Sequence, residues 1–295
     1  MRKLDPRWYQ IATLSGLLAF GIARLHFDVA SWHVPILLGA ALGTQWACTR
    51  LWRTGRFEPK SALISGLSLC LLLRTNHPAW AVAAAAVTIA SKFAIRRQGK
   101  HVFNPTNFGI VLMLLVGAPV WVSPGQWGSG AFFGFLMACA GTLVVTRAAR
   151  ADVTLAFLAA WAVVQFGRAA WLGQPSAVPL HRLENGAAIL FAFFMISDPR
   201  TTPNARPGRI AFAILVAWGA AFVHYGLYRT NGLLWSLAVW SLAVPLLDRL
   251  FPARLYEWNR ATPAPALASI PTSKGEFRES RPDAGLDARS VPVHG

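Results

Sequence analysis

Ten apolar segments, separated by short polar stretches, make up most of this 295-residue chain. Several are shorter than the roughly 20 residues that a regular helix needs to cross a bilayer, so those must tilt, extend into flanking residues or lie within the protein. Only 14% of the residues are charged, against about 25% in an average soluble domain. The sequence therefore predicts an all-α polytopic membrane protein. The approximate segments are Trp8–Ala23, Val29–Thr49, Ser61–Leu73, Pro78–Ile95, Pro105–Val122, Ala131–Thr146, Val153–Phe166, Gly186–Ser197, Ile210–Tyr225 and Gly232–Leu247.

The distribution of basic residues predicts how these segments are oriented. If the N-terminus is cytoplasmic, the inner loops contain 19 Lys and Arg residues, the outer loops contain 5, and the C-terminal tail holds the other 4. Cytoplasmic loops are enriched in Lys and Arg, so this bias favours ten spans with both termini in the cytoplasm. The formal charge of +16 is divided among the loops. We therefore expect the lipid bilayer of a bacterial-type inner (plasma) membrane, and not nucleic acid, as the partner.

Three regions follow from this count. Residues 1–7 are a short cytoplasmic N-terminus, and residues 8–255 are the ten-helix membrane domain. Residues 256–295 contain several prolines and mixed charges without apolar periodicity, so we expect a disordered cytoplasmic tail.

The third and eighth segments are short and interrupted by glycine and proline. Gly66 and Pro78 are 12 residues apart, and Gly186 and Pro199 are 13 apart. Short interrupted segments at corresponding positions of two halves are typical of transporters built from inverted repeats, with the site at the repeat interface. The sequence thus predicts two inverted five-helix repeats, roughly residues 8–122 and 131–250, with broken helices three and eight. A coincidental spacing of Gly and Pro is the alternative.

Polar residues beside these segments form a candidate central site. Asn104 caps a helix that starts at Pro105, and it either does only this or acts with Lys100 to hold an anionic group at the helix N-terminus. Asp198 either caps a helix that starts at Pro199, or binds a cation or an arginine at the inner end of the eighth segment.

Arg74 and the nearby Asn76, which follow the third segment, complete the candidate site. Arg74 either meets the C-terminal carbonyls of a half-helix at membrane depth or extends to water at the outer face. Asp248 and Arg249, at the end of the tenth segment, are predicted to pair with each other.

The sequence contains no catalytic or metal-binding motif. Cys48, Cys70 and Cys139 lie inside apolar segments without the spacing of metal ligands, so we expect buried small hydrophobic side chains. Nucleotide-binding, zinc-protease and nucleophile-triad motifs are also missing. No catalytic residue and no metal site are therefore predicted, and nothing indicates a hydrolase or a nucleotide-driven pump.

Several motifs resemble a known membrane family. They are FNP at residues 103–105 with Gly109, FFMISDP at 193–199, GR at 208–209, NG at 231–232 and PLLD at 245–248. Over roughly residues 30–255, their order resembles the RnfD membrane protein of Rnf electron-transport complexes and its relative in the Na⁺-translocating NADH:quinone oxidoreductase. The resemblance implies a ten-helix membrane subunit in electron transport coupled to Na⁺ or H⁺ movement, with other electron-transport subunits or a redox protein as partners.

The chain departs from this family at the flavin attachment site. The family implies FMN esterified to a threonine of an S-G-A-T motif, but here Ser129-Gly130-Ala131 is followed by Phe132. Phenylalanine has no hydroxyl group, so covalent FMN is not expected, while a non-covalent flavin (FMN or riboflavin) stays open. This departure indicates a divergent, stand-alone member. A small-solute permease without redox chemistry and a membrane anchor for a redox partner are the alternative functions.

Overall fold

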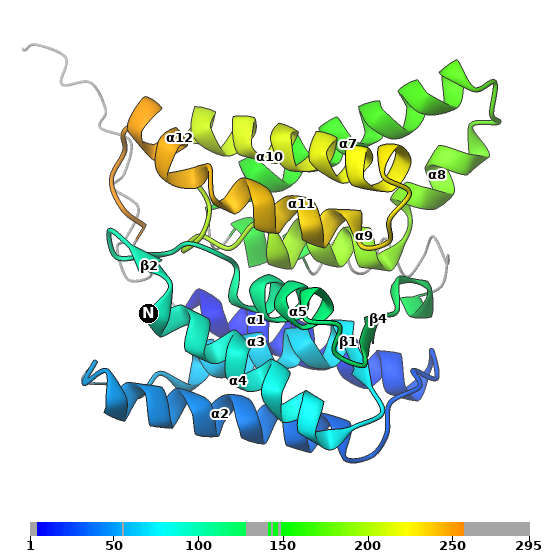
Figure 1. The fold of residues 1–295 in the computed structure, drawn as a ribbon. Helices are drawn as coiled ribbons and strands as arrows, with labels where there is room; N and C mark the ends of the chain where they lie inside the picture. Colours follow the sequence, from blue (N-terminus) through cyan, green and yellow to red (C-terminus); the bar gives the residue numbers. More distant parts are fainter. Residues whose placement is uncertain (1–4, 55, 128–140, 143, 147–148, 257–295) are drawn as a thin grey trace, which may run out of the picture. The chain divides into compact units, whose positions relative to one another are not determined.

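The structure is a computed structural model that describes residues 5–54, 56–127, 141–142, 144–146 and 149–256. Within these residues the protein is mostly helical (Figure 1), which confirms the helical class. Most of the sixth predicted segment, Phe132, Cys139 and the predicted disordered tail from residue 257 onwards lie outside the described residues.

Five α-helices lie in the described part of residues 5–127, and four of them begin with proline. Proline suits the first helical turn because its φ is already helical and its missing N–H would have no partner there. The helices are α1 (Pro6–Ala23), α2 (His33–Leu51), α3 (Pro59–Leu72), α4 (Pro78–Ala94) and α5 (Pro105–Leu115). The shorter elements are β1 (Leu73–Thr75), β2 (Arg96–Arg97), β3 (Lys100–His101), β4 (Val120–Val122) and the 3₁₀ turn η1 (Pro124–Trp127).

The described residues from 149 to 256 form a second set of helices. Two of these helices, α9 and α10, continue into π-helical turns, in which each turn holds more residues than in an α-helix. The elements are α7 (Ala151–Trp171), α8 (Ala177–Leu183), α9 (Gly186–Leu190), η2 (Phe191–Met195), α10 (Arg206–Ala221), η3 (Phe222–Gly226), α11 (Gly232–Ser241) and α12 (Val244–Leu250).

Two short antiparallel strand pairs fix the ends of the helices in the first set. Strand β1 pairs with β4, and Arg74 lies opposite Trp121. Strand β2 pairs with β3, and Arg96 lies opposite His101. The first pair joins the C-terminal end of α3 to the chain that follows α5. The second pair leads from α4 into the N-terminus of α5.

The helices of the two sets pack in the same order. In the first set, α2 packs on α4 and α4 on α5; in the second set, α7 packs on α10 and α10 on α11. Helices α1 to α5 lie together in the lower part of Figure 1, and α7 to α12 lie in its upper part. Helix α5 also contacts α11, so it connects the two sets.

Helix α5 approaches α4 closely because Gly109 has no side chain. A Cβ atom at Gly109 would overlap the Thr88 hydroxyl and would lie 3.3 Å from the Ala84 carbonyl oxygen. Small residues allow helix backbones to approach in this way inside membrane proteins. The close packing holds α5 against α4, and the N-terminal end of α5 lines the cavity described below.

By length and composition, two of the described helices are long and apolar enough to cross a bilayer. They are Ala151–Trp171 and Arg206–Gly226, the second of which includes the π turn η3. The pair α11 and α12, bent by 52° at a short break, would be a third span. Four other apolar helices are shorter, as the sequence predicted for several segments: Pro59–Leu72, Pro78–Ala94, Pro105–Leu115 and Gly186–Met195.

The predictions for segments five and ten are wrong in their C-terminal parts. Segment five was expected to continue to Val122, but α5 ends at Leu115, Gly117 adopts a φ of +67°, and the chain continues as β4. Segment ten breaks into α11 and α12. Pro245 accounts for this break, because a proline inside a helix removes one hydrogen bond and clashes with the carbonyl of the preceding turn.

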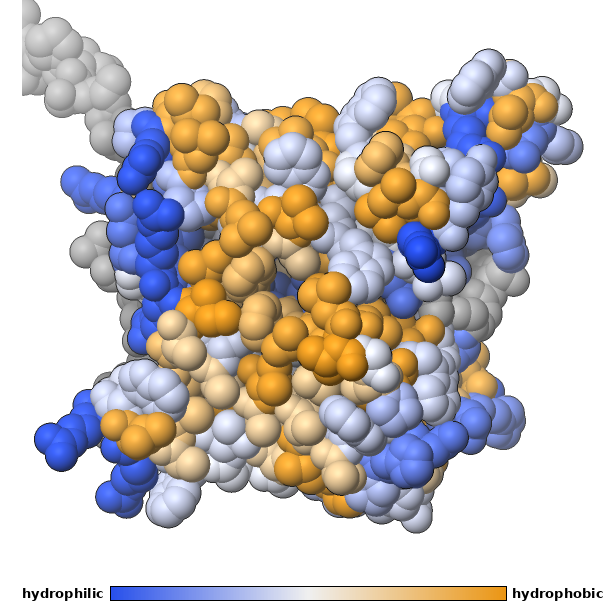
Figure 2. Space-filling model, in the orientation of Figure 1, coloured by the Kyte–Doolittle hydropathy of each residue, from blue (hydrophilic) through white to orange (hydrophobic). Residues whose placement is uncertain are grey.

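The surface also has the character of a membrane protein. Figure 2 shows apolar side chains across the middle of one face, with hydrophilic residues gathered towards the ends of the helices. Large exposed apolar side chains include Leu155, Val163, Trp218, Phe222 and Val239. Extended apolar surfaces of this kind mark contact with a partner or a membrane.

Candidate functional site

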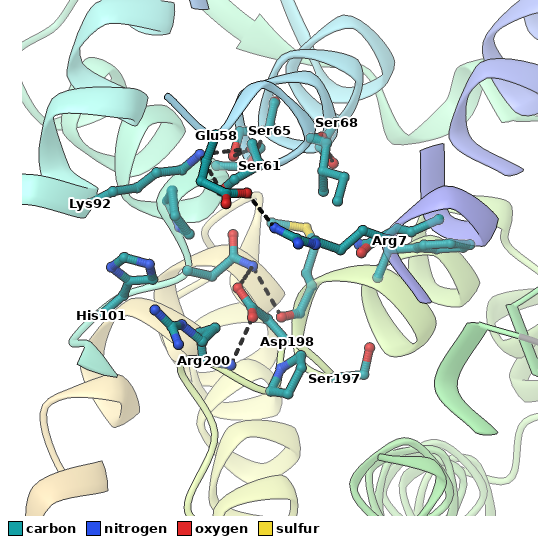
Figure 3. A pocket seen from close by; sticks show the side chains of 18 of the residues that line it. Arg7, Glu58, Ser61, Ser65, Ser68, Lys92, His101, Ser197, Asp198 and Arg200 are labelled. Carbon is teal, nitrogen blue, oxygen red and sulfur yellow. Dashed lines mark hydrogen bonds and ion pairs between the residues drawn. The ribbon is translucent and has the colours of Figure 1, made fainter. Parts of the chain in front are cut away.

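A cavity of about 550 Å³ lies between the two sets of helices (Figure 3). We call it the polar cavity. Residues of α1, α3, the end of α4, the start of α5 and the end of η2 line it. Its polar lining includes Gln45, Ser61, Ser65, Ser68, Lys92, Asn104, Thr106, Asp198 and Arg200.

Asn104 and Asp198 meet in this cavity. The Asn104 side-chain oxygen accepts a hydrogen bond from the Asn107 N–H at 3.1 Å and so caps α5, as predicted. Its Nδ2 donates to the Met195 carbonyl oxygen at 3.3 Å and, at 3.4 Å, to Oδ2 of Asp198. The structure therefore brings together two of the predicted site residues, one from each set of helices.

Asp198 does not cap a helix, contrary to one of its two predicted roles. Its Oδ1 accepts a hydrogen bond from the Arg200 N–H at 2.9 Å, and its carbonyl oxygen accepts bonds from the N–H groups of Thr201 and Thr202. These bonds close a tight turn beyond η2. The carboxylate is thereby held at the cavity wall beside Asn104, where burial raises its pKa against the opposing effects of Arg200 and nearby cations.

A serine face of α3 forms the opposite wall of the cavity. Ser61, Ser65 and Ser68 recur at helical spacing and therefore lie on one side of the helix. Lys92, at the end of α4, is 5% exposed and donates to the Ser61 carbonyl oxygen at 2.8 Å and to Ser61 Oγ at 3.0 Å. Sequence reasoning missed Lys92 and these serines, although polar residues at this spacing in an apolar segment were a usable signal.

Lys100 lies outside the polar cavity, in a separate buried cluster. Its Nζ donates to Oδ2 of Asp248 and to the Thr202 carbonyl oxygen, both at 2.7 Å. Burial lowers the pKa of Lys100, and the ion pair with Asp248 offsets part of this effect. The predicted pairing of Asp248 with Arg249 is wrong, because Arg249 is exposed and Asp248 is held by Lys100 and by the Asn204 N–H.

Arg74 and Asn76 are not among the residues that line the polar cavity. Arg74 lies beyond the C-terminal end of α3 and is 4% exposed. It donates to the carbonyl oxygens of Cys70 and Leu73, at 2.7 Å and 2.8 Å, and to Gln126 Oε1 at 2.7 Å. Arg74 thus binds the terminal carbonyls of a short helix, which was one of its two predicted roles. Asn76 is exposed in the loop that follows.

The charged groups around the polar cavity are mainly basic. Arg7, Arg56, Arg96 and Arg200 line it, and Arg7 is paired with Glu58 at 2.7 Å. Burial, together with the charges of Arg200, Lys92 and Arg96, lowers the pKa of His101 to about 3, so this histidine is neutral at physiological pH. The cavity therefore combines the half-buried carboxylate of Asp198 and the exposed carboxylate of Glu58 with an excess of positive charge, which suits a ligand that carries an anionic group.

The resemblance implies a flavin, and the side chains of the polar cavity fit such a group. Gln45 is 5% exposed, lines the cavity, and its Oε1 has no hydrogen-bond partner among the described residues, so it is available to an N–H of a ligand. Phe93 and Phe194 add aromatic surface, and Arg96 and Arg200 add positive charge. The volume also falls within the usual range of ligand sites, about 300–1,000 Å³.

These observations define a class: a mostly helical membrane protein with a polar cavity between two sets of helices. Residues 120–257 match the NQR2, RnfD, RnfE family. This stretch of the chain is therefore distantly similar to the family that the sequence motifs predicted, and the similarity to the RnfD proteins covers about half of the chain.

Three relatives show how far the similarity extends, each named as the D-type component of an ion-translocating oxidoreductase complex. The Erwinia tasmaniensis protein is 30% identical over 139 residues, which are 46% of this chain and 36% of the relative. The Tolumonas auensis protein is 38% identical over 82 residues, 27% of this chain and 23% of the relative. An Escherichia coli protein is 27% identical over 169 residues, 54% of this chain and 43% of the relative. The matches thus span less than half the length of these relatives.

Proposed function

We propose that this protein is an integral membrane subunit of an Rnf-type electron-transport complex, in which electron transfer is coupled to ion movement. The contact between Asn104 and Asp198 at the polar cavity carries this proposal. This contact joins the two sets of helices. It lies beside one short helix of each set: α3 in the first set, and α9 with its continuation η2 in the second. Membrane transporters built from repeats place their substrate and ion sites at such a junction. The names of the relatives support the coupling of a redox reaction to ion movement.

In this proposal the polar cavity faces the cytoplasm. The basic residues that line it, Arg7, Arg56, Arg96 and Arg200, come from four separate segments that the charge bias assigns to the inner side. Both termini would then be cytoplasmic, and the membrane would be a bacterial-type inner membrane.

We also propose ten spans arranged as two inverted five-helix repeats, residues 8–122 and 131–250. The support is the common packing order, in which α2, α4 and α5 correspond to α7, α10 and α11. The spacing of glycine and proline adds no support, because Gly66 lies in the middle of α3 whereas Gly186 begins α9.

A flavin held in the polar cavity would supply the electron-carrying chemistry. Gln45 and Asn104 would hydrogen-bond it, Arg96 and Arg200 would neutralise a phosphate, and Phe93 would pack on an apolar ring. Asp198 would stay available to a cation or a proton beside the bound group. The partners in this proposal are the other electron-transport subunits of such a complex or a separate redox protein.

The attachment of any flavin is expected to be non-covalent. Phe132 stands where the family has the acceptor threonine, so no phosphoester forms at that position. After denaturing gel electrophoresis the protein band is expected to show no flavin fluorescence, whereas any flavin released by denaturation appears in the supernatant. A fluorescent band in the denaturing gel would contradict this expectation.

The function is tested by ion uptake into inverted membrane vesicles with NADH as the reductant. Asp198→Asn keeps the size of the side chain and removes its charge, and we expect reductant-dependent Na⁺ or H⁺ uptake to fall about tenfold or more, since hydrogen bonds to a charged group are among the stronger ones. The matched control is Asp28→Asn, at an exposed loop position. The amount and melting temperature of each variant in the membrane exclude a folding defect.

Two results together would refute the proposed function. One is unchanged reductant-dependent uptake in Asp198→Asn, and the other is the failure of any redox subunit to co-purify with the tagged wild-type protein. The same purification also tests the third function, membrane anchoring, which predicts a stable redox partner without any ion or solute flux.

A small-solute permease is the second candidate function, and one observation favours it. Met195, which is 2% exposed, lines both the polar cavity and a smaller pocket at the other end of η2. Met195 is therefore part of the wall of both cavities, which would form one passage if they joined there. A colourless, flavin-free preparation that carries solute into proteoliposomes would favour this permease over the redox subunit.

A further inference from the structure

The smaller pocket, of about 240 Å³, lies where α9, α10 and α11 meet. We call it the apolar pocket. Apolar side chains of both sets of helices form most of its walls: Leu72, Val122, Phe191, Leu233 and Leu234. A hydrated ion would lose its water against such walls at a large cost in free energy. The pocket therefore fits a mostly apolar molecule.

The polar groups at this pocket are mainly hydrogen-bond donors. Trp161 is 8% exposed and lines the pocket, and its indole N–H has no hydrogen-bond partner among the described residues. Arg182 also lines the pocket, and its guanidinium group donates to the Tyr225 hydroxyl. That hydroxyl in turn donates to Gln165 Oε1 at 2.6 Å, so its own proton is already used.

The N-terminus of α11 adds further donors to the same pocket. Asn231, with a φ of +59°, leads into the helix, and no side chain caps it. The first N–H groups of a helix have no partner within the helix and carry a partial positive charge. Gly232 lines the pocket, and a Cβ atom there would lie only 2.7 Å from the Ala220 carbonyl oxygen. Close packing on α10 thus fixes this helix end at the pocket.

The charged residues at the pocket restrict the charge of the ligand that can bind there. In the described part of the chain no Asp or Glu lines it, while Arg182 does. Asn185 also lines it, but its side-chain oxygen already accepts the Ala187 N–H at 2.8 Å. The electrostatics consequently disfavour a cationic ligand and favour an electron-rich oxygen.

We propose that the apolar pocket is a binding site for an acyl chain whose carboxylate or ester carbonyl oxygen accepts hydrogen bonds from Trp161 and Arg182. The acyl chain would lie against the apolar walls, and the oxygen would face the donors at the N-terminus of α11. The source is either a free fatty acid or the ester group of a lipid. This site does not depend on the proposed redox function.

Photolabelling of the detergent-solubilised full chain with a diazirine derivative of octanoic acid tests the site. We expect adducts on peptides that contain residues 161, 185–195 or 224–234, and competition by octanoate and methyl octanoate but not by octylamine. Competition by octanoate about tenfold stronger than by its methyl ester identifies a free fatty acid, whereas equal competition identifies an ester carbonyl. Octylamine that competes as well as octanoate would overturn the proposal, as would adducts confined to other peptides.

Two variants test the named donors. Trp161→Phe keeps an aromatic ring and removes the N–H, and Arg182→Gln removes the charge; each is expected to weaken octanoate competition about three- to tenfold, the usual effect of one lost hydrogen bond. The matched control is Trp171→Phe on the same helix, because Trp171 is 85% exposed and lies outside the pocket. Unchanged competition in both variants, with melting temperatures like that of the wild type, would refute the assignment of these donors.

Discussion

Lys100→Met is expected to destabilise the protein by about 3–5 kcal/mol, the usual cost of breaking a buried ion pair from one side. The side chains of Lys100 and Asp248 are only 8% and 12% exposed, and their charged atoms are 2.7 Å apart. Methionine matches the uncharged stem of lysine but leaves the Asp248 carboxylate buried without its cation. The Thr202 carbonyl oxygen and Asn204 Oδ1 also lose the donor that now joins them. Thermal unfolding in detergent, followed by tryptophan fluorescence, measures the loss.

Removing both partners should cost much less than removing one. In Lys100→Met with Asp248→Leu neither charge of the ion pair remains, and we expect most of the lost stability to return, since an apolar replacement of a buried ion pair is often neutral. Arg249→Met is the matched control, because Arg249 is the exposed neighbour of Asp248. If Lys100→Met and Arg249→Met lowered the melting temperature equally, the ion pair would have no structural importance.

Gly109→Ala is expected to destabilise the protein by about 1–3 kcal/mol or more, because it overpacks the junction between α4 and α5. The new methyl group would overlap Thr88 Oγ1, and the backbone carbonyl of Ala84 lies 3.3 Å away and leaves little space for movement. Helix α5 would have to move away from α4, and Asn104 would move with it. A lower melting temperature should therefore accompany weaker ligand binding in the polar cavity.

Thr88→Ala should rescue much of this loss. Thr88 is fully buried, and its hydroxyl has no hydrogen-bond partner among the described residues, so its removal alone should cost little. The double variant Gly109→Ala with Thr88→Ala is expected to melt well above Gly109→Ala. Gly39→Ala in α2 is the matched control, because a Cβ atom there meets nothing within 4 Å. Failure of the rescue would show that the close approach of α4 and α5 is not limited by this contact.

The sequence predicted the helices better than their long-range contacts. Prolines at the starts of α4 and α5 marked those helix boundaries because proline is favoured in the first turn, whereas α3 begins at Pro59, two residues before its predicted start. The capping role of Asn104 was predicted from the same local rule. The sequence predicted that Asn104 and Asp198, 94 residues apart, lie in one central site, because both residues flank predicted apolar segments. It did not predict their hydrogen bond.

Contacts decided by tertiary packing were not predictable from local pattern. We predicted that Asp248 pairs with its neighbour Arg249. Its partner is Lys100, which is 148 residues away in the sequence: Lys100 lies in β3, and Asp248 lies in α12. Lys92 looked like an ordinary loop charge at the end of an apolar segment. It is buried because the Ser61 oxygens of α3 accept its hydrogen bonds. Arg74 was grouped with the central site, but β1 carries it away from the cavity residues of α3.

Because of the π-helical turn at Phe191–Met195, the position of the Asp198 carboxylate depends on the number of residues in this turn as well as on their identity. Each residue in an α-helix advances the chain by about 100° around the axis, and a π turn accommodates an additional residue without lengthening the helix by a full step. The direction of the chain beyond Met195 is therefore set by how many residues follow Asn185. A chain one residue shorter in this turn would keep every side chain of FFMISDP and still direct the carboxylate of Asp198 away from Asn104.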